Sequence, residues 1–346
     1  MAARIAINGF GRIGRLFFRA AYGHKGLNVA AINDLGDIEN LAYLLQYDSV
    51  YRTYDKKVTF KRDPSGVGGE IDVDGKKVVV VQEKDPAKLP WKQMKIDVAV
   101  ESTGAFESFE KASAHLIAGA KRVVITAPAK DEERADAKTV LMGVNEEDFK
   151  TCKVTSNGSC TTNATHPVIA VLLENPGIKK AFLATVHGYT ATQNLVDGPT
   201  RGKDFRRGRA GAVNISPSFT GAAISVTRPL PELAGKFDGL AYRVPIVAGS
   251  LADITFVAKR NTSAQEINDI LTKAANSSRW KDILGVTNDQ IVSSDVIGIS
   301  YGSLVDLQST KVVDGDLVKV LSWYDNEAGY VSTLVQHVLK AVEYLV

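Results

Sequence analysis

The stretch ARIAINGFGRIG, residues 3–14, decides the fold. Its first six residues read as a short apolar strand, and the residues that follow it, 15–22, are compatible with a helix. Between them lies a turn made of Gly9, Phe10, Gly11, Arg12, Ile13 and Gly14. The first glycine permits a tight turn, the second lets the backbone approach a pyrophosphate, and the third allows close helix packing. A glycine turn alone is weak evidence, since an ordinary turn shows the same pattern.

An acidic residue at the next strand end strengthens this interpretation. Residues 27–33 form a second apolar strand that leads into Asp34, which lies 20 residues after Gly14. At that offset a carboxylate takes up a ribose hydroxyl in dinucleotide-binding proteins. Because the same carboxylate would repel a 2′-phosphate, the sequence predicts NAD rather than NADP. The alternative is that Asp34 only caps a turn or a helix.

The remainder of the first half alternates strands and helices. We expect strands at residues 98–103, 123–127, 140–144 and 153–156, and helices at 38–47 and 108–118. This rhythm predicts a doubly wound parallel sheet of the Rossmann type, with helices on both faces. Thr103 and Gly104 follow one of its strands, where such sheets bind ligands.

The second half has a different pattern. Alternating strands are expected at residues 182–189, 240–244, 251–258, 304–307 and 317–322, with a helix at 265–274. They predict an α+β domain with a mostly antiparallel sheet. Residues 330–346 carry apolar side chains on one helical face, and we expect this helix to pack back onto the first domain. The predicted domains are therefore residues 1–159 with 326–346, and residues 160–325.

Composition excludes several classes of protein. The chain of 346 residues is 45% hydrophobic and 23% charged, and it lacks an apolar run long enough to cross a membrane. It begins without the features of a signal peptide, so we expect a cytoplasmic protein. Its net charge of +3 gives no general attraction to nucleic acid or anionic lipid. Two cysteines make no disulfide framework, and no His/Cys/Asp cluster has the spacing of a metal site.

One of the two cysteines is a candidate nucleophile. Cys160 lies in the stretch SCTTN, residues 159–163, between a predicted strand and the helical run 167–174. Unpaired amides and the positive end of the dipole at a helix start favour thiolate over thiol. The alternative is a small buried residue, since free cysteine is among the most buried types.

His187 is the candidate base. It lies in a predicted strand 27 residues after Cys160, which leaves room for a helix and a returning strand. A cysteine and a histidine are the pair that a thiolate mechanism needs, although spacing alone does not place them in contact. A lone histidine is more often a structural residue of the core or surface.

The loop at residues 190–221 is rich in hydroxyls and basic residues, and Arg243 follows at the end of a strand. A loop of this length is usually functional or lies at a subunit interface. Hydroxyls, amides and a bidentate arginine suit phosphate binding. The alternatives are an ordinary edge arginine and a nucleic-acid surface, but the basic run has no interleaved aromatic apart from Phe205.

With these residues in view, the sequence resembles phosphorylating glyceraldehyde-3-phosphate dehydrogenases over nearly its full length. The segments that carry the resemblance are AINGFGRIGR, NDL after the second strand, SNGSCTTN, TVHGYTATQ, PSFTGAA, the arginine in YRVP, and WYDNEAGY. The resemblance implies that Cys160 attacks the aldehyde and that hydride passes to NAD. Inorganic phosphate then cleaves the thioester, with His187 as the acid and base. It also implies a homotetramer in the cytoplasm.

The resemblance further implies roles for individual residues. It assigns the C3 phosphate of glyceraldehyde 3-phosphate to Thr190, Thr192 and Arg243, and inorganic phosphate to Ser159, Thr161, Thr220 and Gly221. Its cofactor residues are the glycine turn with Asp34, together with Lys84, Thr103, Gly104, Thr126, Asn326 and Tyr330. The Gly198-Pro199 pair agrees with a preference for NAD.

Some positions depart from the family pattern. Ala164 replaces a second cysteine that is common one turn beyond the nucleophile, and Lys84, Ile224 and Ala328 replace residues that are common near the cofactor or after TGAA. The nearest alternative is a dehydrogenase for erythrose 4-phosphate, against which the hydroxyls of Thr190 and Thr192 argue. Alternatives of another class are a redox sensor that uses Cys160 and a protein that binds nucleic acid as its primary role.

Overall fold

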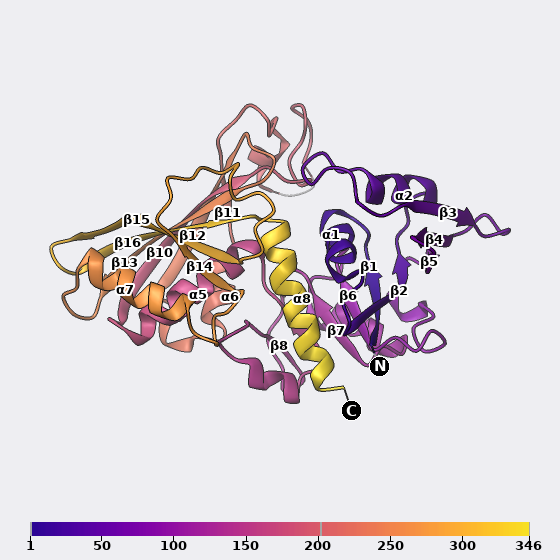
Figure 1. Ribbon diagram of the computed structural model, residues 1–346, viewed down its shortest axis with the longest axis horizontal. Helices are drawn as coiled ribbons and strands as arrows, with labels where there is room; N and C mark the ends of the chain where they lie inside the picture. Colours follow the sequence, from indigo (N-terminus) through magenta and orange to yellow (C-terminus); the bar gives the residue numbers. More distant parts are fainter. Residues whose placement is uncertain (1, 201–202, 346) are drawn as a thin grey trace. The chain divides into compact units, whose positions relative to one another are not determined.

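The computed structural model describes residues 2–200 and 203–345, and its contacts divide the chain into two compact units. Unit 1 comprises Met1–Val140, Asn145–Gly158 and Leu334–Val346, and unit 2 comprises Leu141–Val144 and Ser159–Thr333. The domain boundaries expected from the sequence at 159/160 and 325/326 stay a prediction. Figure 1 shows the elements of each unit, coloured along the chain.

Unit 1 is built on a nine-stranded sheet whose central strands are parallel. The antiparallel strands β3, β4 and β5 extend one edge of this sheet, because β5 pairs in parallel with β2. In spatial order the strands are β3 (Val58–Arg62), β4 (Gly69–Val73), β5 (Lys76–Val81), β2 (Leu27–Asn33), β1 (Ala3–Asn8), β6 (Val98–Glu101), β7 (Arg122–Ile125), β9 (Val154–Ser156) and β8 (Ala137–Thr139). The helices are α1 (Arg12–Ala21), α2 (Ile38–Gln46), α3 (Phe109–Ala112) and α4 (Ala114–Ile117).

Burial explains why the apolar runs of this unit form parallel strands. All of β6 and β7 is buried, and so is nearly all of β1 and β2, as expected for strands covered on both faces. The edge strand β3 is mostly exposed and ends in the two charged residues Lys61 and Arg62. The mostly parallel sheet of the predicted fold class is confirmed.

One predicted strand is wrong. Residues 140–144 do not form a strand, and the extended segment is instead β8, Ala137–Thr139, which pairs in parallel with β9. Strand β8 ends at Thr139, and the buried Leu141 and Met142 lead into a turn in which Gly143 has a φ of +79°. An apolar run therefore marked burial here but not strand pairing. The helix expected at 108–118 is divided into the two short helices α3 and α4.

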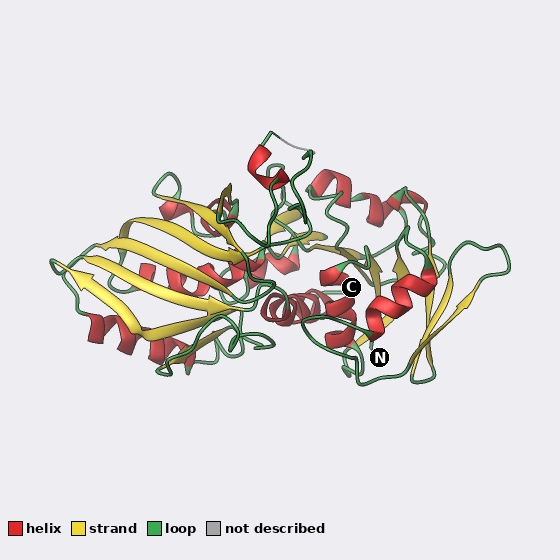
Figure 2. Ribbon diagram, turned by 90° about the horizontal axis from the view of Figure 1, so that it is seen from above, coloured by secondary structure: helices red, strands yellow, loops and turns green. Residues whose placement is uncertain are grey.

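Unit 2 contains a seven-stranded mixed sheet, shown as yellow arrows in Figure 2. Its pairs are antiparallel except β10 with β12 and β14 with β15. In spatial order the strands are β11 (Ser216–Phe219), β12 (Phe237–Val244), β10 (Ile178–Gly188), β13 (Ser250–Ala258), β16 (Leu317–Tyr324), β15 (Ser303–Val313) and β14 (Leu284–Thr287). The fold class predicted for this half is confirmed, although the sequence did not indicate β11 and β14.

Helices α5 (Cys160–Glu174), α6 (Ala222–Thr227) and α7 (Ala264–Ala275) pack on this sheet and on one another. The strict alternation of buried and half-buried residues along β13 is typical of a strand with one face on the core. Helix α8 (Ala328–Glu343) begins in unit 2, and its residues from Leu334 onward belong to unit 1. There His337 lies 2.7 Å from the Thr155 hydroxyl, and Arg122 donates to the carbonyl of Tyr344.

None of the helices in residues 2–200 and 203–345 combines the length and apolar character needed to cross a membrane. Within the same ranges, no group of three or more His, Cys, Asp or Glu side chains is arranged to hold a metal ion.

Candidate active site and cofactor site

Cys160 is the first residue of helix α5, and Ser159 is its N-cap. The Ser159 hydroxyl accepts from the amide of Thr162, whose own hydroxyl accepts from the Ser159 amide, so the two residues form a capping box. The amide of Asn163 donates to the Ser159 carbonyl in the first turn. The capping box thus leaves the amides of Cys160 and Thr161 as the donors nearest to the thiol.

The structure brings His187 against this thiol. His187 is only 3% exposed near the end of β10, and its Nε2 lies 3.4 Å from Cys160 Sγ. On the other side of the ring, Nδ1 lies 2.7 Å from the carbonyl oxygen of Gly188. An imidazole held at Nδ1 directs Nε2 at the sulfur, which is the geometry that a general base requires.

Strand register places Arg243 beside the same imidazole. Strands β10 and β12 are parallel and pair His187 directly with Arg243. Nη1 of Arg243 lies 2.6 Å from His187 Nδ1 and donates to the Gly188 carbonyl at 3.1 Å. The arginine therefore adds a positive charge at the back of the histidine ring.

Burial sets the protonation of this pair. It raises the pKa of the Cys160 thiol, while Arg243 and the amides at the start of α5 oppose that shift. Burial, and then Arg243, lowers the pKa of His187 to about 3. The amides at the helix start lower this pKa, in the direction expected from the sequence, while desolvation is the larger and opposing effect. The role of Cys160 as a nucleophile stays a prediction.

Tyr324 is a part of this centre that the sequence analysis missed. Its ring packs edge-on against His187, with centroids 6.0 Å apart. Its hydroxyl lies 2.9 Å from the Thr161 hydroxyl and 2.7 Å from that of Thr185, and burial raises its pKa. Tyr324 lies within the quoted segment WYDNEAGY, but only the pairing of β16 with β13 shows that it reaches the helix start.

The predicted residues for the C3 phosphate lie close together. The hydroxyls of Thr190 and Thr192 are 3.0 Å apart, and Thr192 lines a small cavity together with Arg243. Arg206 and Arg207 from the long loop line the same cavity. Arg206 also pairs with Asp204, and Arg207 donates to the hydroxyl of Ser218. This arrangement suits an anion.

The predicted residues for inorganic phosphate are less clearly assembled. Thr161 is 4% exposed, and its hydroxyl is engaged by Tyr324, while the Ser159 hydroxyl serves the capping box. Thr220 and Gly221 lie at the start of α6, where the Thr220 hydroxyl accepts from the amide of Ala222. Helix α6 packs against α5, which brings the segments that carry the two groups of residues near each other.

Asn326 and Tyr330 lie in unit 2 at the start of α8. Asn326 is 5% exposed, and its Oδ1 accepts from the hydroxyl of Ser250 at 3.0 Å. Tyr330 is 3% exposed in the first turn of the helix.

The glycine turn of unit 1 has the geometry predicted for a dinucleotide site. Gly9 has a φ of +92°, and a Cβ there would lie 2.6 Å from the amide nitrogen of Thr103. At Gly14 a Cβ would lie 2.1 Å from the Gly9 carbonyl oxygen, so this glycine permits the helix to pack on the turn. Gly11 caps α1 without a side-chain hydrogen bond, and a Cβ there would meet open space. That space at an uncapped helix start fits a pyrophosphate.

A cavity of about 380 Å³ extends from this turn along the strand ends of unit 1. Asp34 lies at its wall, and its carboxylate accepts from the amides of Phe10 at 2.7 Å and Gly36 at 2.8 Å. Several predicted cofactor residues line it: Gly9, Gly11, Asp34, Lys84 and Thr103. The other predicted residues of unit 1 are not among those that line it. Phe10 is buried, and Arg12 is ion-paired with Asp48. Ile13 and Gly14 lie in the first turn of α1, Gly104 follows Thr103, and Thr126 follows the last residue of β7.

A buried carboxylate supports this cavity and was also missed. Glu101 is 3% exposed, accepts from the amide and hydroxyl of Thr103, and accepts from Asn8 Nδ2 at 2.5 Å. His115 Nε2 lies 2.9 Å from the same carboxylate, and its Nδ1 accepts from Trp91. These partners come from β1, β6 and α4, so only the folded sheet shows the network.

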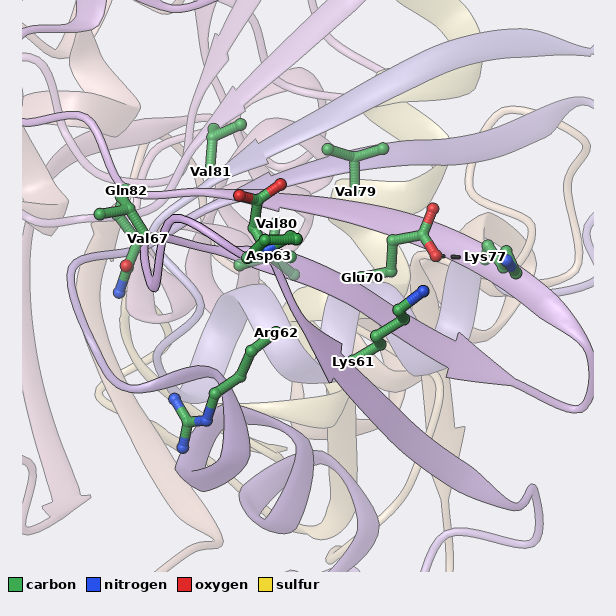
Figure 3. A pocket seen from close by; sticks show the side chains of 12 residues that line it. Lys61, Arg62, Asp63, Val67, Glu70, Lys77, Val79, Val80, Val81 and Gln82 are labelled. Carbon is green, nitrogen blue, oxygen red and sulfur yellow. Dashed lines mark ion pairs between the residues drawn. The ribbon is translucent and has the colours of Figure 1, made fainter.

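A second cavity of unit 1, about 590 Å³, lies on strands β3, β4 and β5 (Figure 3). Its charged side chains are partly paired with one another, as in the ion pair of Lys77 with Glu70. Arg62 at its rim is paired with Asp37 and Glu39. None of the predicted site residues lines this cavity, and we assign it no role.

A Rossmann-type sheet with an uncapped glycine turn, followed by a unit that carries a cysteine–histidine pair, defines a class of nucleotide-dependent dehydrogenases. Comparison with known proteins agrees. Residues 3–109 match the family "Glyceraldehyde 3-phosphate dehydrogenase, NAD binding domain", and residues 159–326 match "Glyceraldehyde 3-phosphate dehydrogenase, C-terminal domain".

Individual relatives extend over the whole chain. The sequence is 49% identical to the glyceraldehyde-3-phosphate dehydrogenase of Clostridium pasteurianum, over 96% of each chain. It is 45% identical to that of Borreliella burgdorferi, over 98% of this chain and 100% of the relative. It is 44% identical to that of Zymomonas mobilis, over 97% of each chain. The chain belongs to the glyceraldehyde-3-phosphate dehydrogenase family and is an NAD-dependent oxidoreductase.

Proposed function

We propose that this enzyme oxidises D-glyceraldehyde 3-phosphate with NAD and inorganic phosphate to 1,3-bisphosphoglycerate. The observation that carries the proposal is the contact of 3.4 Å between Cys160 Sγ and His187 Nε2 at an N-terminal helix turn. A half-buried thiol next to a positioned imidazole suits covalent catalysis on an aldehyde.

In the first step Cys160 Sγ forms a bond to the aldehyde carbon. The thiol proton passes through His187 to the former carbonyl oxygen, which becomes the hydroxyl of a hemithioacetal. The amide of Cys160, which the capping box leaves unused, donates to that oxygen while its negative charge develops. Bound NAD supplies the acceptor for the hydride that leaves the same carbon.

His187 then moves a proton at each later stage. It takes the hydroxyl proton as the hydride leaves, so that a thioester remains on Cys160. A phosphate oxygen attacks this thioester, the carbon–sulfur bond breaks, and the departing sulfur recovers a proton from His187. A neutral imidazole is the form that takes up a proton, and the low pKa of His187 keeps it neutral at rest.

The remaining residues bind the two phosphates and the cofactor. Thr190, Thr192 and Arg243 hold the C3 phosphate, supported by the cavity that Thr192 and Arg243 share. Ser159, Thr161, Thr220 and Gly221 serve inorganic phosphate. The glycine turn and Asp34 bind the pyrophosphate and the ribose, and Asn326 orients the carboxamide. The carboxylate of Asp34 would repel a 2′-phosphate, which favours NAD over NADP.

Turnover tests the proposal directly. Purified enzyme should form NADH from glyceraldehyde 3-phosphate and NAD only when inorganic phosphate is present, and turnover with NADP should be much lower. The Cys160→Ser variant should lose about 10⁴-fold or more in kcat, as removal of a nucleophile does elsewhere. Full activity in this variant would refute the central assignment. A strong preference for erythrose 4-phosphate would favour the sister activity, and absence of NADH formation would favour a redox sensor.

We further propose that the enzyme is a cytoplasmic homotetramer. The long loop of residues 190–221 carries large apolar side chains in exposed positions, among them Leu195 at 83% and Phe205 at 78% exposure. Exposed apolar groups concentrated in one segment mark an interaction surface. Light scattering of the purified protein should give about four times the chain mass of 37.3 kDa, and a monomer at micromolar concentration would refute this part.

A further inference from the structure

Ser250 lies between the histidine strand and Asn326 and contacts both. It is the first residue of β13 and is 1% exposed. Its Oγ accepts from the amide of Gly188 at 3.3 Å, and its hydroxyl donates to Oδ1 of Asn326 at 3.0 Å. Gly188 directly follows His187, so one hydroxyl joins the strand of the base to the amide side chain.

The donors and acceptors leave a single arrangement for this link. The Gly188 amide can only donate, so Ser250 must accept there. The hydroxyl proton of a residue this buried also needs an acceptor, because an unsatisfied buried polar group costs about 1–3 kcal/mol. Asn326 Oδ1 is the acceptor within reach, so the oxygen of this amide faces Ser250. Its Nδ2 group therefore faces away, with no hydrogen-bond partner among the described residues.

We propose that Ser250 is a positioning residue, which locks the Asn326 amide so that Asn326 presents N–H donors, and not an acceptor, to the carboxamide oxygen of the nicotinamide. The inference rests on the proposed role of Asn326 and adds what fixes the orientation of that side chain. Without the hydroxyl, the two ends of the amide become nearly equivalent, and a flipped amide would present its oxygen to the carboxamide oxygen.

The test compares binding of NAD with binding of ADP-ribose, which lacks the nicotinamide, by isothermal titration calorimetry. In Ser250→Ala, affinity for NAD should fall about three- to tenfold, the size of one lost hydrogen bond, while affinity for ADP-ribose should not change. Ser250→Thr, which keeps the hydroxyl, should restore the affinity for NAD. Equal losses for both ligands would show a merely structural role and would overturn the inference.

A matched control comes from the same sheet. Ser322 is also fully buried, and its hydroxyl pairs with that of Ser303 at 2.7 Å, away from Asn326. Ser322→Ala should leave the ratio of NAD to ADP-ribose affinity unchanged. If it lowered this ratio as much as Ser250→Ala, the effect would belong to the sheet in general and the inference would fail.

A double variant separates this inference from the proposed function. Asn326→Ala alone should lower affinity for NAD but not for ADP-ribose, and failure of that result would refute the role of Asn326 itself. If Asn326→Ala behaves as expected, adding Ser250→Ala to it should cause no further loss, since Ser250 acts through Asn326. Additive losses would overturn the inference and leave the role of Asn326 intact.

Hydride stereochemistry gives a second readout. With substrate deuterated at the aldehyde carbon, NMR of the NADH product should show deuterium on one face of the nicotinamide for the parent and for Ser250→Thr. Ser250→Ala should place a measurable share on the other face. Product confined to one face in Ser250→Ala, together with unchanged affinity for NAD, would overturn the inference.

Discussion

Helices α1 and α5 both begin at a proposed binding site, but the first turn of α1 is uncapped and that of α5 is capped by side chains. Helix α1 has Gly11 as its N-cap, makes no side-chain cap, and leaves open space where a side chain would be. Helix α5 closes its start with the capping box of Ser159 and Thr162. An open helix start offers several donors and its dipole to a diffuse charge such as a pyrophosphate. A closed start leaves only the amides beside Cys160, which suits one developing oxyanion.

After Cys160→Ser, the largest effect should come from replacing His187, the residue that contacts the thiol on the closed helix. His187→Asn should lower kcat by about 10²- to 10⁴-fold, the usual contribution of a general acid and base. The same variant should also change how alkylation of Cys160 depends on pH. Burial raises the pKa of Cys160, and without His187 no neighbour takes the proton, so alkylation by iodoacetamide should require higher pH than in the parent. Unchanged NAD binding serves as the folding control, and an unshifted alkylation profile would contradict the pairing.

At the open helix, Gly11→Ala should weaken NAD binding about tenfold or more, or about 1.4 kcal/mol, by filling the space for the pyrophosphate. The melting temperature should hardly change, because Gly11 has a φ of −71° and the added Cβ meets no atom. Gly14→Ala is the contrasting variant. Its Cβ would overlap the Gly9 carbonyl and should cost about 1–3 kcal/mol of stability. Calorimetry and thermal unfolding distinguish the two, and a destabilised Gly11→Ala would contradict the comparison.

Asp34→Asn should have a smaller effect on the same site. Loss of the carboxylate should weaken NAD binding about two- to tenfold and narrow the preference for NAD over NADP, because repulsion of a 2′-phosphate is removed. Asp37→Asn makes the same charge change three residues away, at an N-cap position that asparagine also fills well. A ratio of NAD to NADP affinity that falls equally in both variants would show a general charge effect and not recognition by Asp34.

The smallest effect is expected at the cap of the closed helix. Ser159→Ala should lower the free energy of unfolding by about 1 kcal/mol, as loss of an N-cap does. Ser263→Ala is a matched control, because Ser263 caps α7 in the same unit through the amide of Glu266. Chemical denaturation should give similar losses for the two variants. A rise in KM for phosphate in Ser159→Ala alone would show that this hydroxyl also binds phosphate, whereas equal stability in the parent and Ser159→Ala would refute the cap.

Local patterns predicted the open helix better than the closed one. The positions of Gly9, Gly11 and Gly14 lie within one turn, so the sequence indicated both the bend and the space for a phosphate. At the thiol, the helix start was predicted but the balance of charges was not. Desolvation of Cys160 depends on groups from β10, β12 and β16, and burial of that kind has no signature in neighbouring residues.

The supporting residues of both sites escaped the sequence analysis for the same reason. Glu101, Ser250 and Tyr324 each bind a side chain that lies far away in the sequence: Asn8, Asn326 and Thr185, respectively. An apolar run also gave a wrong prediction at residues 140–144, where the buried side chains belong to a turn and not to a strand. Residue type and spacing in the sequence indicated the reacting residues. The register of the paired strands determines which other side chains contact them, and the sequence did not show that register.

The in-register pairing of His187 with Arg243 has a consequence for chain length. Side chains alternate along β12, so deletion of one residue there would bring Tyr242 or Val244 opposite the histidine and turn the guanidinium to the other face. Insertion or deletion of one residue within β12 would therefore separate Arg243 from His187, even at positions where a substitution would be tolerated. Changes in length that arise in this enzyme must be absorbed outside its strands, in connecting segments such as residues 190–200.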